Sequence, residues 1–159
     1  MHANVTRVVS AAADAGLEID VTRHPEGTRT AEDAARTIGC SVGQIVKSLV
    51  FMVDESPTIA LVSGTNRVDT ARLARAAGGS TARRADGDEA RRATGFAIGG
   101  VPPFGHDRPV PVLIDRDLLE HDELWAAAGL PDAVFAIRPR DLVRVSGGTV
   151  AELAPTEPD

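Results

Sequence analysis

Several features that would point to particular classes of protein are scarce or missing in this chain of 159 residues. Cys40 is the only cysteine, so the sequence can form neither an internal disulfide nor a CxxC metal pair. No apolar run approaches the length of a membrane span, and the N-terminus lacks the basic start and apolar core of a signal peptide. We therefore expect a cytoplasmic protein with no membrane partner.

Aromatic residues and positive charge are scarce as well. Aromatics make up 3% of the chain and tyrosine is absent, so the sequence does not favour a base-stacking platform for single-stranded nucleic acid. The formal net charge of −6 leaves no basic surplus of the kind that free-standing nucleic-acid-binding domains carry. Any nucleic-acid partner would be bound locally or delivered by another protein.

The remaining composition is that of one ordinary globular domain. Hydrophobic residues make up 43% and charged residues 25%, and the chain is long enough to bury a single core. The sequence contains no repeat and no interdomain linker, so we expect one domain over residues 1–154. The acidic, proline-containing tail at residues 155–159 is expected to fray.

Periodicity predicts helices and strands that are mixed along the chain without strict βαβ alternation. The helices are expected over residues 4–15, 30–39, 41–46, 69–77, 86–94 and 139–145. The strands are expected over residues 17–22, 47–53, 58–63, 110–114, 124–128 and 133–137. The second and third strands should pair antiparallel around a turn at residues 55–57. This mixture predicts an α+β domain with a mixed sheet.

The common catalytic fingerprints are missing. The sequence has no GxSxG elbow, no GxxxxGK[ST] phosphate loop and no GxGxxG dinucleotide loop. The run at residues 121–123, His-Asp-Glu, could supply a metal ligand, but such a run is more often a solvated loop, and we expect no metal and no cofactor. Cys40 is better explained as a small buried residue than as a catalytic thiol.

One segment does point to a site. Residues 94–106 have the sequence TGFAIGGVPPFGH, with four glycines and two adjacent prolines. Glycine lets another group approach the backbone closely, whereas Pro102 and Pro103 stiffen the chain and donate no hydrogen bond. The last free amides before the prolines belong to Gly100 and Val101, and two such amides could bind a carbonyl or an oxyanion. An irregular structural turn is the alternative.

Lys47 is a cation that could act together with this loop. It follows a short capped helix and begins a mostly apolar run that is expected to be a central strand. A lysine in that position must snorkel, pair with an acid or face a cavity. The alternative is that Lys47 only marks the solvent end of the strand. With the glycine loop it would make a site for a carbonyl or a phosphate.

These segments together resemble the YbaK/EbsC, or prolyl-tRNA-editing, family of aminoacyl-tRNA deacylases. The matching segments, in order between about Thr30 and Leu153, are QIVKSLVF, VDTARL, TGFAIGGVPPFGH and VLID. The resemblance implies a barrel-like mixed sheet surrounded by helices. It also implies hydrolysis of the ester that joins a wrong amino acid to its tRNA, without a metal or a cofactor.

The resemblance assigns roles to individual residues. Lys47 corresponds to the functional lysine of the family, and Gly100 and Val101 to the loop that faces the ester, so these three are the expected catalytic residues. Ser48 occupies a position where relatives line the pocket with Thr, Ser or Asn. The other expected substrate-binding residues are Gly99, Pro102, Pro103, His106, Asp115, Ala127 and Gly129.

The sequence departs from the cysteinyl-tRNA-editing branch of that family. The branch resembles SGGxRG followed by an acid, but here Ala127 and Val134 replace the serine and the acid, and the branch's tyrosine near the second strand is missing. We therefore expect a different subgroup, whose pocket admits small amino acids. The alternative is a non-catalytic module that binds an aminoacyl or nucleotide group. The expected partners are an aminoacyl-tRNA and a synthetase or elongation factor that delivers it.

The expected reaction is attack by water on the ester carbonyl. The amides of Gly100 and Val101 would hold the developing oxyanion, and Lys47 would orient the substrate through its phosphate or its carbonyl. No side chain is an obvious general base, which leaves a hydroxyl, amino or side-chain group of the substrate to assist.

Overall fold

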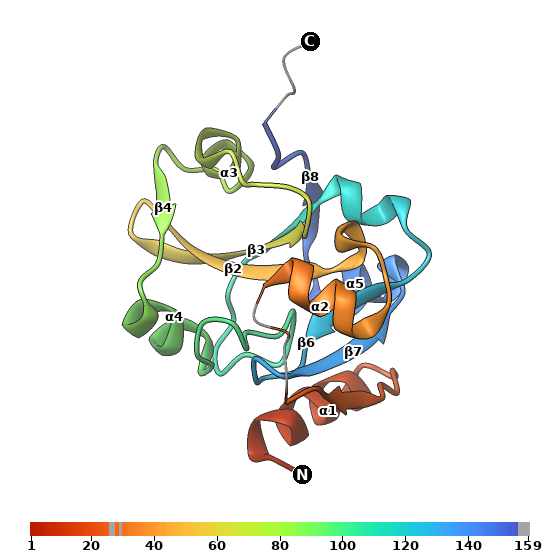
Figure 1. The fold of residues 1–159 in the computed structure, drawn as a ribbon. Helices are drawn as coiled ribbons and strands as arrows, with labels where there is room; N and C mark the ends of the chain where they lie inside the picture. The colour runs from red at the N-terminus through yellow and green to blue at the C-terminus, as the bar shows by residue number, and fades with distance from the viewer. Residues whose placement is uncertain (26–27, 29, 156–159) are drawn as a thin grey trace.

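The computed structural model of the protein describes residues 1–25, 28 and 30–155. Within this part of the chain there are five α-helices, two short 3₁₀-helices and eight strands in two sheets (Figure 1). The α+β class is therefore confirmed. The tail at residues 155–159 lies outside the described residues except for Pro155.

The longest strands form the hairpin that the sequence predicts. β2 (Val46–Val53) and β3 (Ser56–Ser63) pair antiparallel along their whole lengths. Asp54 and Glu55 both have positive φ between the strands, as a two-residue type I′ turn requires. The turn thus lies one residue earlier than expected, and Pro57 already belongs to β3.

Three further strands complete a five-stranded sheet in the order β4-β2-β3-β5-β8. β5 (Val112–Asp115) runs parallel to β3, and β8 (Thr149–Ala151) runs parallel to β5. β4 (Ala82–Arg84) pairs antiparallel with the far end of β2. β4 and β8 have three residues each and were not predicted, because so short a run shows no alternation.

A second sheet has the order β1-β7-β6 and is antiparallel throughout. It consists of β1 (Val21–Arg23), β6 (Leu124–Ala127) and β7 (Ala133–Ile137). The strand predicted over residues 17–22 is wrong in its first four residues. One parallel bridge between Ile45 and Trp125 connects this sheet to the larger one. Because the described strands form two sheets, the predicted barrel-like closure is not confirmed.

α2 and α4 begin and end at the capping residues that the sequence shows. Thr30 accepts a hydrogen bond from the Asp33 amide at the start of α2, and Gly39 ends that helix in the left-handed conformation. The predicted helix at residues 41–46 is a single 3₁₀ turn. The helices are α1 (Ala3–Asp14), α2 (Ala31–Ile38), α3 (Thr70–Ala76), α4 (Gly87–Thr94) and α5 (Pro139–Ser146), with 3₁₀-helices at Val42–Gln44 and Arg116–Glu120.

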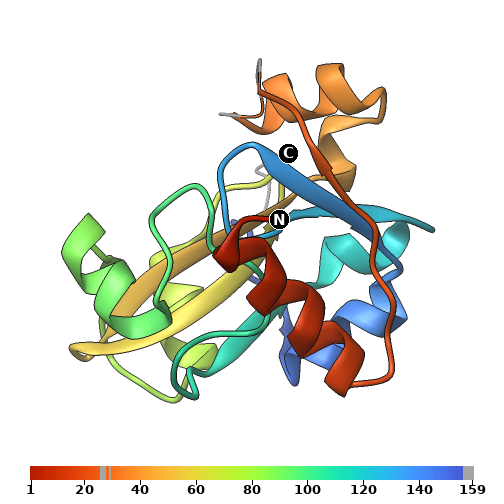
Figure 2. The ribbon, with the colours of Figure 1, turned by 90° about the horizontal axis from the view of Figure 1, so that it is seen from below.

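The main core lies between α1 and the two sheets, and it anchors the glycine loop that follows α4. Phe96 and Phe104, at the two ends of that loop, are buried in the core, and Phe104 packs against Phe135 with the ring centroids 5.7 Å apart. Figure 2 shows α1 beside the loop. The Arg7 guanidinium on α1 lies 4.3 Å from the centre of the Phe96 ring and forms an ion pair with Asp107. The loop is therefore held from both sides.

No helix in the described part of the chain is long and apolar enough to cross a membrane.

Candidate active site

A pocket of about 410 Å³ is lined by residues of β2 and β6 and by Ile45, which forms the bridge between the sheets with Trp125. Its volume falls in the range of sites for small ligands. Because β4 pairs only with Phe51–Val53, the first half of β2 has no strand partner on that side among the described residues, and it lines the pocket instead. The other walls come from the start of α2, from β6 and from the glycine loop.

The pocket combines apolar walls with three charged side chains. The apolar walls include Ile45, Val46, Val50, Trp125, Ala126 and Val134. The charged side chains are Glu32 on α2, Lys47 on β2 and Arg84 at the end of β4. An apolar pocket with a few charged groups is the usual form of a site that orients a small polar ligand.

Lys47 is held in place by a chain of hydrogen bonds that leads to a buried carboxylate. Its Nζ donates to the backbone oxygen of Asn66 at 2.5 Å. The side-chain amide of Asn66 donates to Asp115 at 2.8 Å and to Asp117 at 2.7 Å. Asp115 is only 1% exposed and also accepts from the amides of Ser63 and Asp117. Asp115 therefore supports Lys47 through Asn66. It does not line the pocket, although it was predicted to bind substrate.

The surroundings of Lys47 act on its pKa in opposite directions. Burial lowers the pKa of Lys47 below its ordinary value, and this is the largest effect. The Glu32 carboxylate opposes that shift, and the Arg84 guanidinium adds to it. Glu32 and Arg84 are therefore both close enough to Lys47 to influence it.

Ser48 lines the pocket, but its hydroxyl is itself buried. Its Oγ is buried and has no hydrogen-bond partner within the described part of the chain. Buried polar groups in folded proteins nearly always have a partner, because an unmet one costs free energy. The hydroxyl of Ser48 is such an unmet group, and its predicted contact with substrate stays a prediction.

The glycine loop forms a tight turn beside the pocket. The Gly100 amide donates to the Ala97 carbonyl at 3.0 Å, and Gly99 has a φ of +90° at the third position of that turn, as a type II turn requires. The prediction that the Gly100 amide is free is therefore wrong. Gly99 and Val101 line the pocket, and neither amide has an acceptor among the described residues.

Gly100 and Gly129 serve contacts within the protein instead. A Cβ on Gly100 would lie 2.9 Å from Leu130 Cα and 3.0 Å from the Gly129 oxygen. Gly129 has a φ of +96°, and its carbonyl accepts a hydrogen bond from the Asn4 side chain at 3.0 Å. These glycines let the loop, the β6–β7 turn and α1 pack closely, and neither lines the pocket.

His106 and the two prolines brace the loop from outside the pocket. Pro102 and Pro103 are buried, and His106 Nε2 lies 2.7 Å from the Pro102 oxygen. The nitrogen must carry a proton to donate to that carbonyl. Burial lowers the pKa of His106, which favours the neutral ring. None of the three lines the pocket, and in this structure they support the loop.

Five of the predicted residues line the pocket: Lys47, Ser48, Gly99, Val101 and Ala127. The sequence missed Glu32, Trp125 and Arg84. Arg84 could have been found only by recognising β4, since alternation along a strand places Arg83 and Arg84 on opposite sides.

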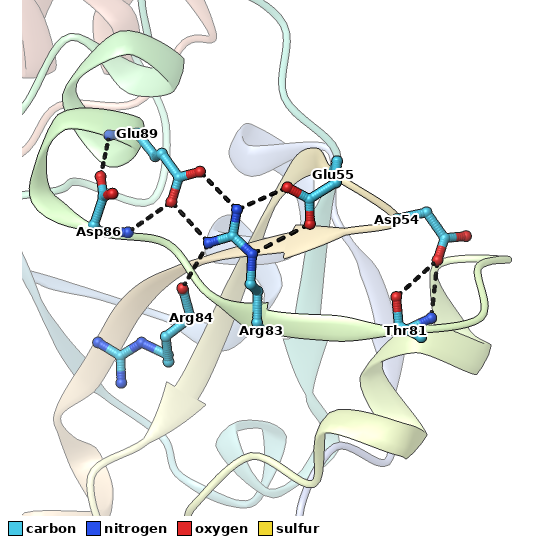
Figure 3. A network of polar contacts seen from close by, with 7 residues as sticks. All are labelled: Asp54, Glu55, Thr81, Arg83, Arg84, Asp86 and Glu89. Atoms are coloured by element: carbon cyan, nitrogen blue, oxygen red, sulfur yellow. Dashed lines mark hydrogen bonds and ion pairs between the residues drawn. The ribbon is translucent and has the colours of Figure 1, made fainter.

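Figure 3 shows why Arg84, rather than Arg83, remains available to the pocket. Arg83 forms ion pairs with Glu55 and Glu89, each at 2.8 Å, and Glu89 also belongs to the capping box at the start of α4. The Arg84 side chain points away from this network. Its guanidinium lies 5.6 Å from the centre of the Phe51 ring, and it has no ion pair among the described residues.

No cluster of three or more His, Cys, Asp or Glu residues in the described ranges could hold a metal ion. The charged residues that line the pocket are Glu32, Lys47 and Arg84, and Ser48, Gly99 and Val101 lie beside them.

Comparison with known proteins identifies the family of the chain. The model of the aminoacyl-tRNA editing domain matches residues 25–145. A crystal structure described as a candidate trans-editing enzyme for prolyl-tRNA synthetase has a TM-score of 0.92 and 44% identity, covering 98% of this chain and 99% of that one. The multifunctional Ser/Thr-tRNA deacylase ProXp-y of Escherichia coli K12 is 26% identical over 145 residues, 88% of this chain and 86% of its own. EbsC of Enterococcus faecalis, a candidate Cys-tRNA(Pro)/Cys-tRNA(Cys) deacylase, is 24% identical over 129 residues, 80% of this chain and 79% of its own. This chain belongs to the aminoacyl-tRNA editing domain family.

Proposed function

We propose that the protein is a trans-acting deacylase, which hydrolyses the ester of a mischarged tRNA that carries a small amino acid. One observation carries the proposal: Lys47, Ser48 and the loop residues Gly99 and Val101 all line the same pocket. Membership of the editing family and relatives named as tRNA deacylases support the reaction class.

In the proposed reaction, water attacks the ester carbonyl. The oxygen of the water bonds to the acyl carbon, the bond from that carbon to the ribose oxygen breaks, and the proton ends on the ribose oxygen. The amides of Gly99 and Val101 donate to the oxyanion that develops. The turn bond at Gly100 and the buried ends of the loop hold these amides in place before the reaction, which is what makes such donors effective.

The two cations of the pocket have separate tasks in this proposal. Lys47 uses one of its three N–H groups on Asn66, so two remain for the ester carbonyl or the developing oxyanion. Arg84 binds the phosphate of the terminal nucleotide, since a guanidinium presents several donors in a plane that matches a phosphate. Neither histidine nor cysteine lines the pocket in the described part of the chain, so a ribose hydroxyl of the substrate assists the proton transfer.

The walls of the pocket set the size of the amino acid. Ala127 and Val134 are side chains without polar atoms, and they face the pocket from β6 and β7. Binding alone separates similar amino acids weakly, because one missing methylene costs a binding site only about 1–3 kcal/mol. In this proposal the pocket therefore selects the amino acid by the size of its side chain. Small residues enter, and large side chains are excluded.

A partner delivers the tRNA in this proposal. The net charge of −6 gives the protein no overall attraction for the tRNA body, and Arg83 is paired with acids. We therefore expect weak, salt-sensitive binding of tRNA by the protein alone. A prolyl-tRNA synthetase is the candidate partner, in line with the description of the structural relative.

A panel of tRNAs charged with alanine, serine, threonine, cysteine, leucine or phenylalanine tests the function. The account predicts release of at least one small amino acid, at rates well above spontaneous hydrolysis, and no release of leucine or phenylalanine. A non-catalytic binding module would instead bind the charged tRNA and leave every ester intact.

A further inference from the structure

We propose that Glu32 receives the α-ammonium group of the aminoacyl ester, so that the protein prefers esters with a free amino group to N-acylated ones. The inference rests on the proposed function and adds a second requirement to it. The substrate must be an aminoacyl ester and not a peptidyl or formylated one.

The position of Glu32 is the first support. It lies in the first turn of α2, and it is one of the residues that line the pocket. Of the described residues that line the pocket, Glu32 is the only acid. A substrate that enters the pocket therefore meets one carboxylate.

The lack of an internal partner is the second support. The neighbouring Asp33 forms an ion pair with Arg36 at 3.5 Å, whereas Glu32 has no ion pair or hydrogen bond to its carboxylate among the described residues. Glu32 influences Lys47 electrostatically, yet the two side chains are not within ion-pair distance. Glu32 is exposed to solvent where it lines the pocket, so its carboxylate is open to a ligand.

The charges of the substrate are the third support. An aminoacyl ester carries an ammonium group on the carbon next to the carbonyl carbon. The oxyanion develops on the oxygen of that carbonyl. Lys47 and Arg84 suit the oxyanion and the phosphate but repel the ammonium group. Glu32 offsets that repulsion and orients the substrate through a charge-assisted hydrogen bond. An N-acyl group removes the positive charge and adds bulk on the side of α2.

The test compares alanyl-tRNA with N-acetyl-alanyl-tRNA, or the same pair made with the best amino acid of the panel. For each substrate, kcat/KM is divided by the spontaneous hydrolysis rate, because acetylation itself makes the ester less reactive. We expect the parent protein to favour the free amine by at least tenfold after this correction. Glu32→Gln should lower that preference about tenfold, mainly by slowing the free amine, as expected for the loss of one charged hydrogen bond.

Asp33→Asn is the matched control. It removes the same charge from the same turn of α2, but Asp33 does not line the pocket. The backbone amide of residue 33 can still donate to the Thr30 hydroxyl. It should leave the preference unchanged. An unchanged preference in Glu32→Gln, or an equal loss in both variants, would overturn the inference while leaving the deacylase intact. A parent protein that hydrolyses no free aminoacyl ester would instead overturn the proposed function and this inference with it.

Discussion

Lys47 is joined to the buried carboxylate of Asp115 through a single residue, Asn66. The Asn66 backbone oxygen accepts from the lysine Nζ at 2.5 Å, and its side-chain amide donates to Asp115 at 2.8 Å. The buried Asp115 carboxylate thus holds Asn66 in place, and the Asn66 carbonyl holds Lys47. Since three donors converge on Asp115, this arrangement is stiff, and it orients Lys47 before a substrate arrives.

Asp115→Asn should weaken both the fold and the reaction. An amide nitrogen in place of one carboxylate oxygen would face the buried donors, and an unmet buried donor costs about 1–3 kcal/mol. We expect urea unfolding to report a loss of that size, and deacylation to fall as Lys47 loses its support. Asp117→Asn, at an exposed side chain that also bonds Asn66, should stay within about ±0.5 kcal/mol. Equal stability of Asp115→Asn and the parent would count against the positioning role.

Gly100→Ala should destabilise the protein, because the new methyl group would lie 2.9–3.0 Å from backbone atoms of Gly129 and Leu130. Backbone cannot move aside cheaply, so we expect a lower melting temperature and reduced deacylation as the loop is pushed away from the pocket. Gly87→Ala is the control, because a Cβ added at Gly87 would have nothing within 4 Å and the residue is helical. That change should raise stability by about 0.4–1 kcal/mol. Parent-like melting of Gly100→Ala would refute the contact.

Ser48→Ala should separate binding from stability. The hydroxyl has no partner among the described residues, so its removal should leave the free energy of unfolding unchanged or raise it by up to about 1–3 kcal/mol. The KM of the best substrate should rise. Ser63→Ala removes a buried hydroxyl that donates to the Gly43 carbonyl at 2.8 Å, and it should cost about 0.5–1.5 kcal/mol. If Ser48→Ala loses as much stability as Ser63→Ala, its hydroxyl is structural.

The local signals in the sequence predicted most of the fold. Thr30 and Asp86 cap helices, Gly39 and Gly95 end them, and the β2–β3 hairpin follows from two apolar runs around a turn. β4 and β8 were missed because their three residues are strands only through pairing with distant neighbours. The barrel-like closure came from the resemblance to the family, and the described strands form two sheets.

Local signals in the sequence also predicted part of the site. Lys47, Ser48 and the loop stand out by residue type and position, and they line one pocket. The supporting roles of Gly100 and Asp115 depend on Leu130 and Asn66, contacts that no local pattern reveals. In the sequence, nothing distinguishes Glu32 and Arg84 from the other charged residues. Only the folded chain brings them to the pocket.

The pH dependence of deacylation should report Lys47. Burial lowers the pKa of its ammonium from the ordinary value, and the proposed role needs the charged form. After subtraction of spontaneous hydrolysis, kcat/KM should therefore fall as the pH rises through that lowered pKa, below pH 10.5. The residual activity of Lys47→Arg should lack this alkaline decline, because a guanidinium stays charged. The same decline in Lys47→Arg would assign the titration to another group.

Deacylation by Lys47→Ala and Lys47→Arg, on the ester that the parent hydrolyses best, tests the central claim most directly. Both variants should melt like the parent, because the side chain is only partly buried and makes one hydrogen bond. Lys47→Ala should lower kcat/KM by roughly 10²–10³-fold, the scale of one oxyanion donor. Lys47→Arg should lose less, because it keeps the charge but not the compact ammonium. Parent-like turnover by a folded Lys47→Ala would contradict the account.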